Sequence, residues 1–438
     1  MRQMLARSVA VALFAVHIAF TIGGAQTTGA CRFGGWKAPA PIPVSSPTTV
    51  QFTDVVERGS RQYMVSVPFT LSASNGNLHS SKAGATSLNV QTLSGMKLGS
   101  PSGTFVFSYP RAAIDSRGDL HVVWGEPDSF PAHWSVESRA EIPVTSLWYS
   151  VLRNRAWSVP RRIYHAEKII WDPVAMSRLT ADGAGGLRLA FTAVEPRQQQ
   201  QQVVYLAFDG VAWRATKIGK NSPVYADIAL GPRDNVALAF VEAPPARGFG
   251  QWRQNGLFVM TSTDGGARWN PASSVAADDQ MPAYEPHIFY SRLGKIDVVW
   301  TQVDVSGKSG GATLWHATSY DGGRTWRDAS PLVSTRPISK TQAIMDSCGS
   351  IHTSAQVMTV HGPRIGYARV SEKAWTQLDV LFPDQFGAQP TLWLAANGKP
   401  NLVFYQAPSD SSLPTLARLK LTELKDCNGI DAKSVRCR

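Results

Sequence analysis

The sequence predicts an all-β fold, and three observations support this prediction. Short alternating runs rich in β-branched and aromatic residues recur along the chain, as in 119–124 and 295–300, bounded by Gly, Asp and Asn. No stretch outside the N-terminus shows the 3.6-residue period of an amphipathic helix. A Trp follows a strand and a turn at intervals of 56, 56, 57 and 49 residues. These tryptophans are Trp157, Trp213, Trp269, Trp326 and Trp375.

Two octapeptides share a pattern that suits a tight turn. Residues 319–326 read SYDGGRTW, and residues 262–269 read STDGGARW. The Asp carboxylate can accept hydrogen bonds from backbone N–H groups of its own turn, and glycines permit positive φ. We expect the closing Trp to anchor the turn against the sheet of its own repeat. Two copies at matching places in a repeat indicate a structural turn, which carries no information about catalysis.

A repeat of about fifty residues with several strands matches one four-stranded blade of a β-propeller. Units begin near Pro110, Pro173, Tyr225, Pro286, Ser350 and Pro390. The predicted fold is therefore an all-β, six-bladed propeller of four-stranded antiparallel blades over residues 26–421, followed by a C-terminal extension, 422–438. Residues 45–105 hold strand-like runs among Ser, Gly and Asn, and form either an irregular seventh blade or a decoration.

The two ends of the predicted ring are expected to meet. The last unit has no closing Trp of its own, whereas residues 35–39 around Trp36 resemble residues 156–160 around Trp157. The N-terminus is therefore expected to supply the outer strand of the last blade. This closure would remove the exposed edge that an open ring leaves.

The first 25 residues are expected to be a secretory signal peptide. Arg2 and Arg7 precede an apolar run over residues 9–20, and small residues follow at 23–25. The run is too short and wrongly flanked for a stable membrane span. We therefore expect a secreted or periplasmic protein. A lipoprotein anchor at Cys31 is the alternative, but the aliphatic residue usual three positions earlier is missing.

Cysteine count and net charge limit the cofactors and partners. Cys31, Cys348, Cys427 and Cys437 suggest two disulfides in an exported chain, and a bridge from Cys31 to either C-terminal Cys would lock the ring. No Cys/His spacing points to zinc, so neither a metal nor a cofactor is expected. The net charge of +11 comes from scattered Lys and Arg, without the pattern of a nucleic-acid module. It indicates either a solvated basic surface or attraction to acidic glycans.

Through its Asp-box octapeptides and blade rhythm, the chain resembles the sialidase (neuraminidase) superfamily over residues 105–420. This resemblance implies a site on the propeller axis with three arginines for the substrate carboxylate, a Tyr nucleophile activated by a Glu, and an Asp acid/base. Glu285 matches the family Glu. Ser108 stands where the first arginine is expected, 300–302 lacks the second, and 388–391 lacks the nucleophilic Tyr.

Other chemistry can use residues at the blade starts. By position, the axis candidates are Arg111, Asp172, Tyr225, Asp227, Tyr284, Glu285, His287 and His352. The predicted catalytic set is Glu285, Arg111, Asp172, Tyr284 and His287. Carboxylates suit acid/base work, and His or Tyr suits proton abstraction. A polysaccharide lyase would use such a base, with Arg111 neutralising a uronate. Asp172 and Glu285 each precede a Pro, which is also typical of a turn at a strand entrance.

These observations together favour an exported, sialidase-like propeller that acts on extracellular carbohydrate, as a glycoside hydrolase or polysaccharide lyase without the full sialidase set. The alternative is a non-catalytic propeller that binds a glycan or a protein. The expected partner is an extracellular, acidic glycan rather than nucleic acid, and the protein is expected to be a monomer.

Overall fold

A computed structural model gives the fold of the chain. It describes residues 36–42, 49–69, 71–74, 77–80, 88–101, 109–128, 144–170, 177–194, 201–218, 223–242, 256–276, 283–291, 293–303, 311–371, 374–407 and 418–423. All regular secondary structure in these ranges is β-strand, so the expected all-β fold is confirmed. No helix among them is long and apolar enough to cross a membrane. The predicted signal peptide and Asp172 lie outside the described residues.

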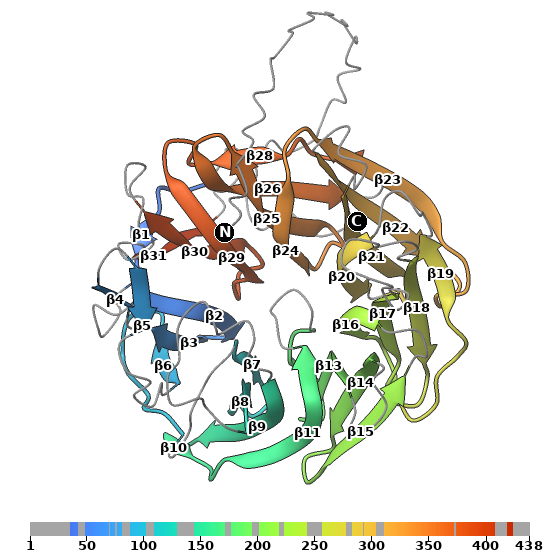
Figure 1. Ribbon diagram of the computed structural model, residues 1–438. Coiled ribbons are helices and arrows are strands. Elements are labelled where there is room, and N and C mark those ends of the chain that lie inside the picture. The colour runs from blue at the N-terminus through green and yellow to red at the C-terminus, as the bar shows by residue number, and fades with distance from the viewer. Residues whose placement is uncertain are drawn as a thin grey trace, which may run out of the picture.

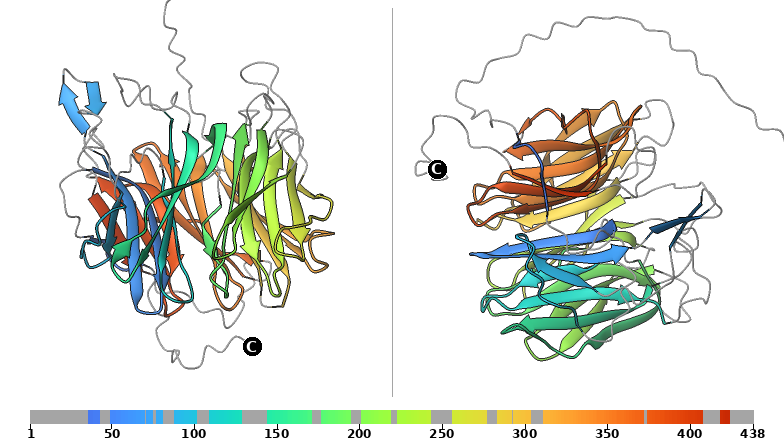
Figure 2. Two further views of the ribbon diagram at one scale, coloured as in Figure 1. Left: turned by 90° about the horizontal axis from the view of Figure 1, so that it is seen from below. Right: turned by 90° about the vertical axis from the view of Figure 1, so that its left-hand side faces the viewer.

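Antiparallel sheets stand side by side around a common centre (Figure 1). The first contains β2 (Thr49–Arg58), β3 (Arg61–Phe69) and β6 (Asn89–Thr92). A hairpin of β4 (Leu71–Ser74) and β5 (Asn77–Ser80) projects from one face of the ring (Figure 2). The second sheet contains β7 (Arg111–Ile114), β8 (Leu120–Glu126), β9 (Val144–Arg153), β10 (Ala156–Trp157) and β11 (Arg161–Ile170).

The third sheet contains β12 (Thr180–Ala181), β13 (Leu187–Val194), β14 (Gln201–Phe208) and β15 (Trp213–Ile218), and β11 joins it to the second by pairing with β13. The fourth contains β16 (Pro223–Leu230), β17 (Val236–Glu242), β18 (Gly256–Ser262) and β19 (Ser273–Ala276). The fifth contains β20 (Ala283–Tyr290), β21 (Ile296–Val303), β22 (Ala312–Ser319) and β23 (Arg327–Ser334). The sixth contains β24 (Ile338–Met345), β25 (Ile351–Thr359), β26 (Gly362–Ser371), β27 (Ala374–Trp375) and β28 (Asp379–Leu381).

The last sheet combines the two ends of the described chain. It contains β29 (Phe386–Leu394), β30 (Pro400–Ala407), β31 (Arg418–Glu423) and β1 (Ala40–Pro41). β1 pairs with β31 through Ala40↔Leu421 and Pro41↔Lys420. Trp36 packs edge-on against Tyr367 of the sixth sheet, with ring centroids 5.0 Å apart. The first sheet, which covers part of residues 45–105, contacts β29 on one side and β7 on the other through β2.

The predicted unit starts agree with the innermost strands at four of the six places. β7, β16, β20 and β29 begin within a few residues of Pro110, Tyr225, Pro286 and Pro390, and Pro173 lies outside the described residues. The start near Ser350 is wrong, because that repeat begins earlier, with β24. β24 reads ISKTQAIM, and its polar Thr341 and Gln342 are buried toward the centre. An innermost strand with buried polar residues lacks the apolar alternation that marks a strand in sequence.

Apolar layers between neighbouring sheets form the core. Fully buried Trp124 of β8 packs with Val65 and Leu88 of the first sheet. Phe240 of β17 packs with Tyr205 of the third sheet in the same manner. Burying one such large side chain stabilises a fold by about 1.5–3 kcal/mol. These layers hold the sheets around the centre and so fix the inner ends of their strands.

The two octapeptides form the predicted turns. Asp321 Oδ1 accepts hydrogen bonds from the backbone N–H groups of Arg324 (3.0 Å) and Thr325 (2.9 Å). Gly322 and Gly323 have positive φ, 72° and 86°. The hydrogen bonds from Thr325 lower the pKa of Asp321, since they favour the ionised form.

The closing tryptophans anchor these turns on the preceding sheet as well as on their own. Trp269 packs edge-on against Tyr205 of β14, with ring centroids 5.2 Å apart, and Trp326 Nε1 donates to Ser273 Oγ of β19 at 3.0 Å. Both partners belong to the preceding sheet, whereas the apolar clusters on which the two indoles pack also contain residues of their own sheets. The indole completes the apolar layer between the two sheets.

Of the four cysteines, Cys348 lies in the described residues, on the exposed turn between β24 and β25. It is disulfide-bonded. The other three, including Cys31, lie outside the described residues, so the bridge from Cys31 to the C-terminus stays a prediction.

Candidate functional site

The innermost strands bring six equivalent residues to the centre. Each of six strand turns is closed by a backbone hydrogen bond from the N–H of its first residue to the carbonyl four positions later. These turns begin at Asp115, Asp182, Gly231, Ser291, Asp346 and Ala395. The residues four positions before the turn starts form what we term the axial ring: Arg111, Arg178, Asp227, His287, Gln342 and Thr391. The strands β7, β16, β20, β24 and β29, which contain five of these residues, lie around the centre in Figure 1.

Arg178 crosses the centre of the molecule. It lies just before β12 in the third sheet, yet its Nη2 donates to Gln342 Oε1 of β24 at 3.3 Å and to the Leu392 carbonyl of β29 at 2.7 Å. Burial lowers the pKa of Arg178, whereas the nearby carboxylate of Asp54 acts in the opposite direction. A guanidinium stays charged in proteins despite such a shift. The ring therefore holds a fixed positive charge near its middle.

Asp227 and His287 face each other on neighbouring sheets. His287 Nδ1 lies 3.8 Å from Asp227 Oδ2, and the same oxygen accepts the backbone N–H of Ile288 at 3.0 Å. His287 Nε2 lies 2.9 Å from the Thr341 carbonyl, so that nitrogen carries the proton when the imidazole is neutral. The Nδ1 lone pair is then directed toward Asp227.

Burial shifts the pKa values of both groups toward their neutral forms. It raises the pKa of Asp227 to about 7, against the opposing effects of the Ile288 N–H and the charge of Arg178. It lowers the pKa of His287 to about 3, and the charges of Arg178 and Arg111 lower it further. At neutral pH, His287 is therefore uncharged. The pKa of Asp227 lies close to neutral pH, which suits a group that both accepts and donates protons.

Glu285, predicted as a catalytic carboxylate, links two sheets. It sits in a β-bulge of β20 with a φ of 49°, and its carboxylate accepts the backbone N–H groups of Lys340 (3.0 Å) and Thr341 (2.7 Å) on β24. Burial raises its pKa, and these hydrogen bonds oppose the shift. Each carboxylate oxygen thus has a backbone donor in the next sheet.

The same type of link recurs around the centre. Asp54 of β2 accepts the backbone N–H of Ala112 on β7 at 2.8 Å, as Asp227 accepts that of Ile288. A carboxylate on one innermost strand therefore satisfies a backbone donor of the next strand, which a bulge or inner edge leaves unpaired. These links hold the inner strands in place.

The remaining predicted residues fall in different places. Tyr284 and Tyr225 meet edge-on beside the axial ring, with ring centroids 6.0 Å apart. Burial raises the pKa of Tyr284, so its hydroxyl stays protonated at neutral pH. Arg111 is buried at the start of β7, and its charge acts on both His287 and Asp227. Asp172 lies outside the described residues.

His352 is not an axis residue, which corrects its predicted place. It lies on the second strand of its sheet, where Nδ1 is 2.7 Å from the Tyr367 hydroxyl and Nε2 is 3.2 Å from Asp346 Oδ2. His121 has the corresponding partners, Tyr149 and Asp115. This buried Asp–His–Tyr arrangement occurs in the second and sixth sheets, where it links the turn after the innermost strand to the neighbouring strands of the same sheet.

Sequence reasoning missed Arg178, although a signal for it exists. Arg111 lies four residues before Asp115, and Arg178 lies four residues before Asp182. Aligning the repeats on these turns, rather than on the tryptophans, places Arg178 beside Arg111 in the axial ring. The pattern also separates His287, which is in the ring, from His352, which is not.

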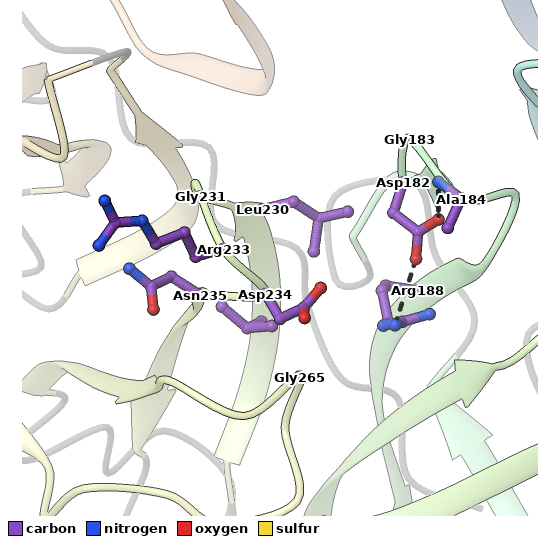
Figure 3. A pocket seen from close by; sticks show the side chains of 11 residues that line it. Asp182, Gly183, Ala184, Arg188, Leu230, Gly231, Arg233, Asp234, Asn235 and Gly265 are labelled. Atoms are coloured by element: carbon purple, nitrogen blue, oxygen red, sulfur yellow. Dashed lines mark hydrogen bonds and ion pairs between the residues drawn. The ribbon is translucent and has the colours of Figure 1, made fainter.

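A separate pocket of about 280 Å³ lies between the turns that follow the innermost strands of the third and fourth sheets (Figure 3). Asp182, Arg188, Leu230 and Asp234 are among its lining residues. Asp182 and Arg188 pair there at 3.3 Å. The pocket contains no residue of the axial ring.

Comparison with known proteins supports the fold. No protein-family model matches the chain, and no curated protein matches it in sequence. Among solved structures, the chain is similar to a PL25 ulvan lyase, with a TM-score of 0.56 at 9% identity over 89% of this chain and 95% of that chain. A second structure of a PL25 ulvan lyase, bound to GlcA(1-4)Rha3S, gives 0.55 with the same identity and coverage.

Two further structures complete this comparison. The polysaccharide lyase Uly1 gives a TM-score of 0.50 at 9% identity over 86% of this chain and 90% of that chain. A Hadza microbial sialidase gives 0.44 at 12% identity over 80% and 75%, a score on which we base no argument. At these identities the likeness to the lyases establishes a shared fold alone. Together with the sheets around one centre, it defines an all-β protein of the propeller type.

Proposed function

We propose that the chain is an exported, monomeric β-propeller whose axial ring acts on an acidic extracellular carbohydrate. The proposal treats the sheets as seven blades, with residues 45–105 supplying the irregular one and β1 closing the ring beside β31. The two Asp-box turns support kinship with the sialidase superfamily. The observation that carries the function is the meeting of Arg111 and Arg178 with Asp227 and His287 at the centre.

Each group of the axial ring has a role that suits its chemistry. A guanidinium recognises a carboxylate through paired N–H donors, so Arg178 and Arg111 are assigned to bind the acid group of the sugar. Asp227, with a pKa raised to about 7, is assigned to transfer protons. Tyr284 keeps its proton and can donate it to a sugar oxygen.

Elimination fits this ring better than hydrolysis. A glycoside hydrolase uses a pair of carboxyl groups on either side of the scissile bond. Within the described part of the axial ring, Asp227 is the single carboxyl, because Glu285 and Asp54 do not occupy ring positions. All three accept a backbone N–H of a neighbouring strand. A polysaccharide lyase needs one acid/base system and a cation that neutralises the uronate. The ulvan lyases that share the fold are enzymes of this class.

The second candidate is a non-catalytic glycan-binding propeller. The observation that favours it is the internal bonding of the centre, where Arg178 already donates to Gln342 and the Leu392 carbonyl. A ring that is fixed by its own contacts can serve as a rigid anion-binding surface without turnover.

A substrate panel distinguishes these two functions. Purified mature protein is incubated with uronate-containing polysaccharides, sialosides and neutral polysaccharides, and products are followed by the absorbance of the double bond that elimination creates and by new reducing ends. Turnover confined to uronate polymers, and lost in Asp227→Asn, supports the lyase. Retained binding without product supports the second candidate. Neither turnover nor binding of any acidic polymer would reject the proposed function.

A further inference from the structure

The pocket between the third and fourth sheets is lined by residues to which the proposed chemistry assigns no role. It has a volume of about 280 Å³ and lies between the turns that begin at Asp182 and Gly231. Each turn follows a residue of the axial ring, Arg178 or Asp227, by four positions, which is about 13 Å of extended chain. The pocket is therefore a second site on the same two inner segments, set apart from the ring.

Two walls face each other across this pocket. Figure 3 shows Leu230 and Asp234 on one side, and Asp182 with Arg188 on the other. Asp182 Oδ2 lies 3.3 Å from Arg188 Nη2, and the two side chains are 23% and 14% exposed. This ion pair is thus largely buried in the protein but still reaches the pocket.

The walls retain hydrogen-bonding groups that the protein does not use. Nη1 of Arg188 donates to two backbone carbonyls, at 2.9 and 3.0 Å, and the ion pair with Asp182 occupies one of the two N–H groups of Nη2. One N–H of Arg188 and one lone pair of Asp182 Oδ2 therefore remain. Among the described residues, the Asp234 carboxylate has no hydrogen-bond or ion-pair partner.

We propose that this pocket binds one neutral sugar unit of a glycan. A sugar hydroxyl both donates and accepts hydrogen bonds, so neighbouring hydroxyls match the free donor of Arg188 and the acceptors of Asp182 and Asp234. Leu230 offers an apolar surface to the C–H groups of the ring. The volume lies just below the usual range for ligand pockets, which begins at about 300 Å³, and therefore suits a single ring rather than a longer segment.

The charges of the pocket favour a neutral ligand over an ionic one. Asp182 and Asp234 carry two formal negative charges, and Arg188 and Arg233 carry two positive charges. A sulfate, phosphate or uronate would lie beside two carboxylates, and an amine would lie beside two guanidinium groups. A hydroxyl-rich, uncharged ring avoids both kinds of repulsion. The axial ring, with Arg111 and Arg178, has the opposite preference.

The pocket is preformed, because hydrogen bonds fix both of its turns. Two backbone N–H groups of the first turn donate to Asp182 Oδ1, at 2.9 and 2.6 Å. In the second turn, Gly231 N–H donates to the Asn235 carbonyl at 2.7 Å, and Gly265 N–H donates to the Asp234 carbonyl at 2.9 Å. Little chain ordering is therefore needed when a ligand binds, which reduces the cost of binding. The site does not depend on the function proposed for the ring.

Saturation-transfer difference NMR of the purified mature protein tests the proposal. The probes are the methyl glycosides of glucose, galactose, mannose and rhamnose, each titrated to about 20 mM. We expect at least one of them to bind with a Kd of about 1 mM, since so small a ligand makes few contacts. Methyl glucuronide at equal concentration should not displace it, because the acidic sugar is directed to the axial ring.

Two variants locate the binding site. Asp234→Gly removes the carboxylate at a φ of 62°, which glycine adopts without strain, and should weaken binding at least about tenfold. Gly183→Leu adds a side chain at the wall of the pocket, where a Cβ meets no atom within 4 Å, and should also weaken binding by occupying the space. Asp384→Gly is the matched control, because Asp384 is an exposed aspartate between β28 and β29.

Each outcome decides the proposal. Binding that either pocket variant weakens, that Asp384→Gly leaves unchanged and that methyl glucuronide does not displace supports the site. The proposal is overturned if none of the neutral glycosides binds, if both pocket variants bind as the wild type does, if Asp384→Gly weakens binding equally, or if methyl glucuronide displaces the neutral sugar. Circular dichroism verifies that each variant keeps the fold. The readout is binding alone, so it is independent of any turnover at the axial ring.

Discussion

Asp227 is the residue on which the proposed chemistry depends most. Its carboxyl is buried beside two guanidinium groups, and burial raises its pKa to about 7. We expect Asp227→Asn to lower kcat by about 10²- to 10⁴-fold, the usual contribution of a positioned acid or base. The measurement is the steady-state rate on the preferred uronate polymer. The wild-type rate should also change with pH near pH 7. Any residual activity of Asp227→Asn should not show this pH dependence.

The same pKa predicts how stability changes with pH. The folded protein keeps the Asp227 proton up to about pH 7, whereas an unfolded Asp releases it near 3.8. The folded state therefore binds more protons between these values, so the free energy of unfolding falls as pH rises from about 4 to about 7 and then levels off. Denaturant unfolding of the wild type and Asp227→Asn across this window checks the sign. An equal slope in both proteins would show that Asp227 is not the titrating group.

Glu285 is assigned a structural role, and substitution tests this. Glu285→Gln replaces an acceptor oxygen with an NH₂ group that faces a backbone N–H of Lys340 or Thr341. We expect a loss of about 1–3 kcal/mol in the free energy of unfolding, measured by chemical denaturation. Unchanged stability with lost activity would return Glu285 to the catalytic set.

At the residue scale, sequence reasoning identified part of the centre. Arg111, Asp227 and His287 were reached because each stands at the start of an apolar strand. Arg178 was not reached, because its partners Gln342 and Leu392 lie 164 and 214 residues further along the chain. A contact across a closed ring has no local signature, and only alignment of the repeats reveals it.

At the scale of the element, the turn that contains Gly265 and Gly266 connects its own sheet to the preceding one. Tyr205 of β14 donates from its hydroxyl to the Gly265 carbonyl at 2.9 Å, and a Cβ on Gly266 would lie 2.2 Å from the Tyr205 ring. The glycine is thus needed for a close approach as well as for its φ of 92°.

A pair of substitutions separates these two requirements. Gly265→Ala has open space around its Cβ but a φ of 72°, and should cost about 1 kcal/mol of unfolding free energy. Gly266→Ala carries similar backbone strain plus the collision with Tyr205, which should add about 1–3 kcal/mol. Denaturant unfolding of both variants provides the comparison. Equal losses would mean that the turn does not dock on the preceding sheet.

The elements differ in how well the sequence predicts them. The octapeptides around Asp264 and Asp321 were found because side chain and backbone of one short segment make the turn. The contact between Trp269 and Tyr205 was not predicted, because Tyr205 lies on another sheet. The strand β24 was not predicted, because polar residues that contact other polar residues at the centre interrupt its apolar pattern.

At the scale of the whole molecule, the first and last described segments of the chain share one sheet. Trp36 fills the place in the last sheet that Trp157 fills in the second, and each packs on the sheet before it. We expect Trp36→Ala to lower the free energy of unfolding by about 2 kcal/mol. This loss is smaller than the ~3–5 kcal/mol for replacing a fully buried aromatic residue by Ala, because Trp36 is half-buried. Thermal unfolding measures the effect.

Two controls accompany this prediction. Trp157→Ala should be destabilising to a similar degree, because it removes the equivalent indole. Val211→Ala, at a position that is 81% exposed, should have almost no effect. If Trp36→Ala matches Val211→Ala instead of Trp157→Ala, the N-terminal segment does not contribute to the last sheet in solution.

The proposed function depends on recognition of a sugar carboxylate by the axial ring. The most direct test compares kcat/KM on one uronate polysaccharide with kcat/KM on the same polymer after its carboxyl groups have been reduced to alcohols, or compares Kd values if no turnover occurs. We expect reduction to abolish measurable turnover or to weaken binding at least about tenfold, since Arg111 and Arg178 lose their charged partner. Equal values for both polymers would contradict it.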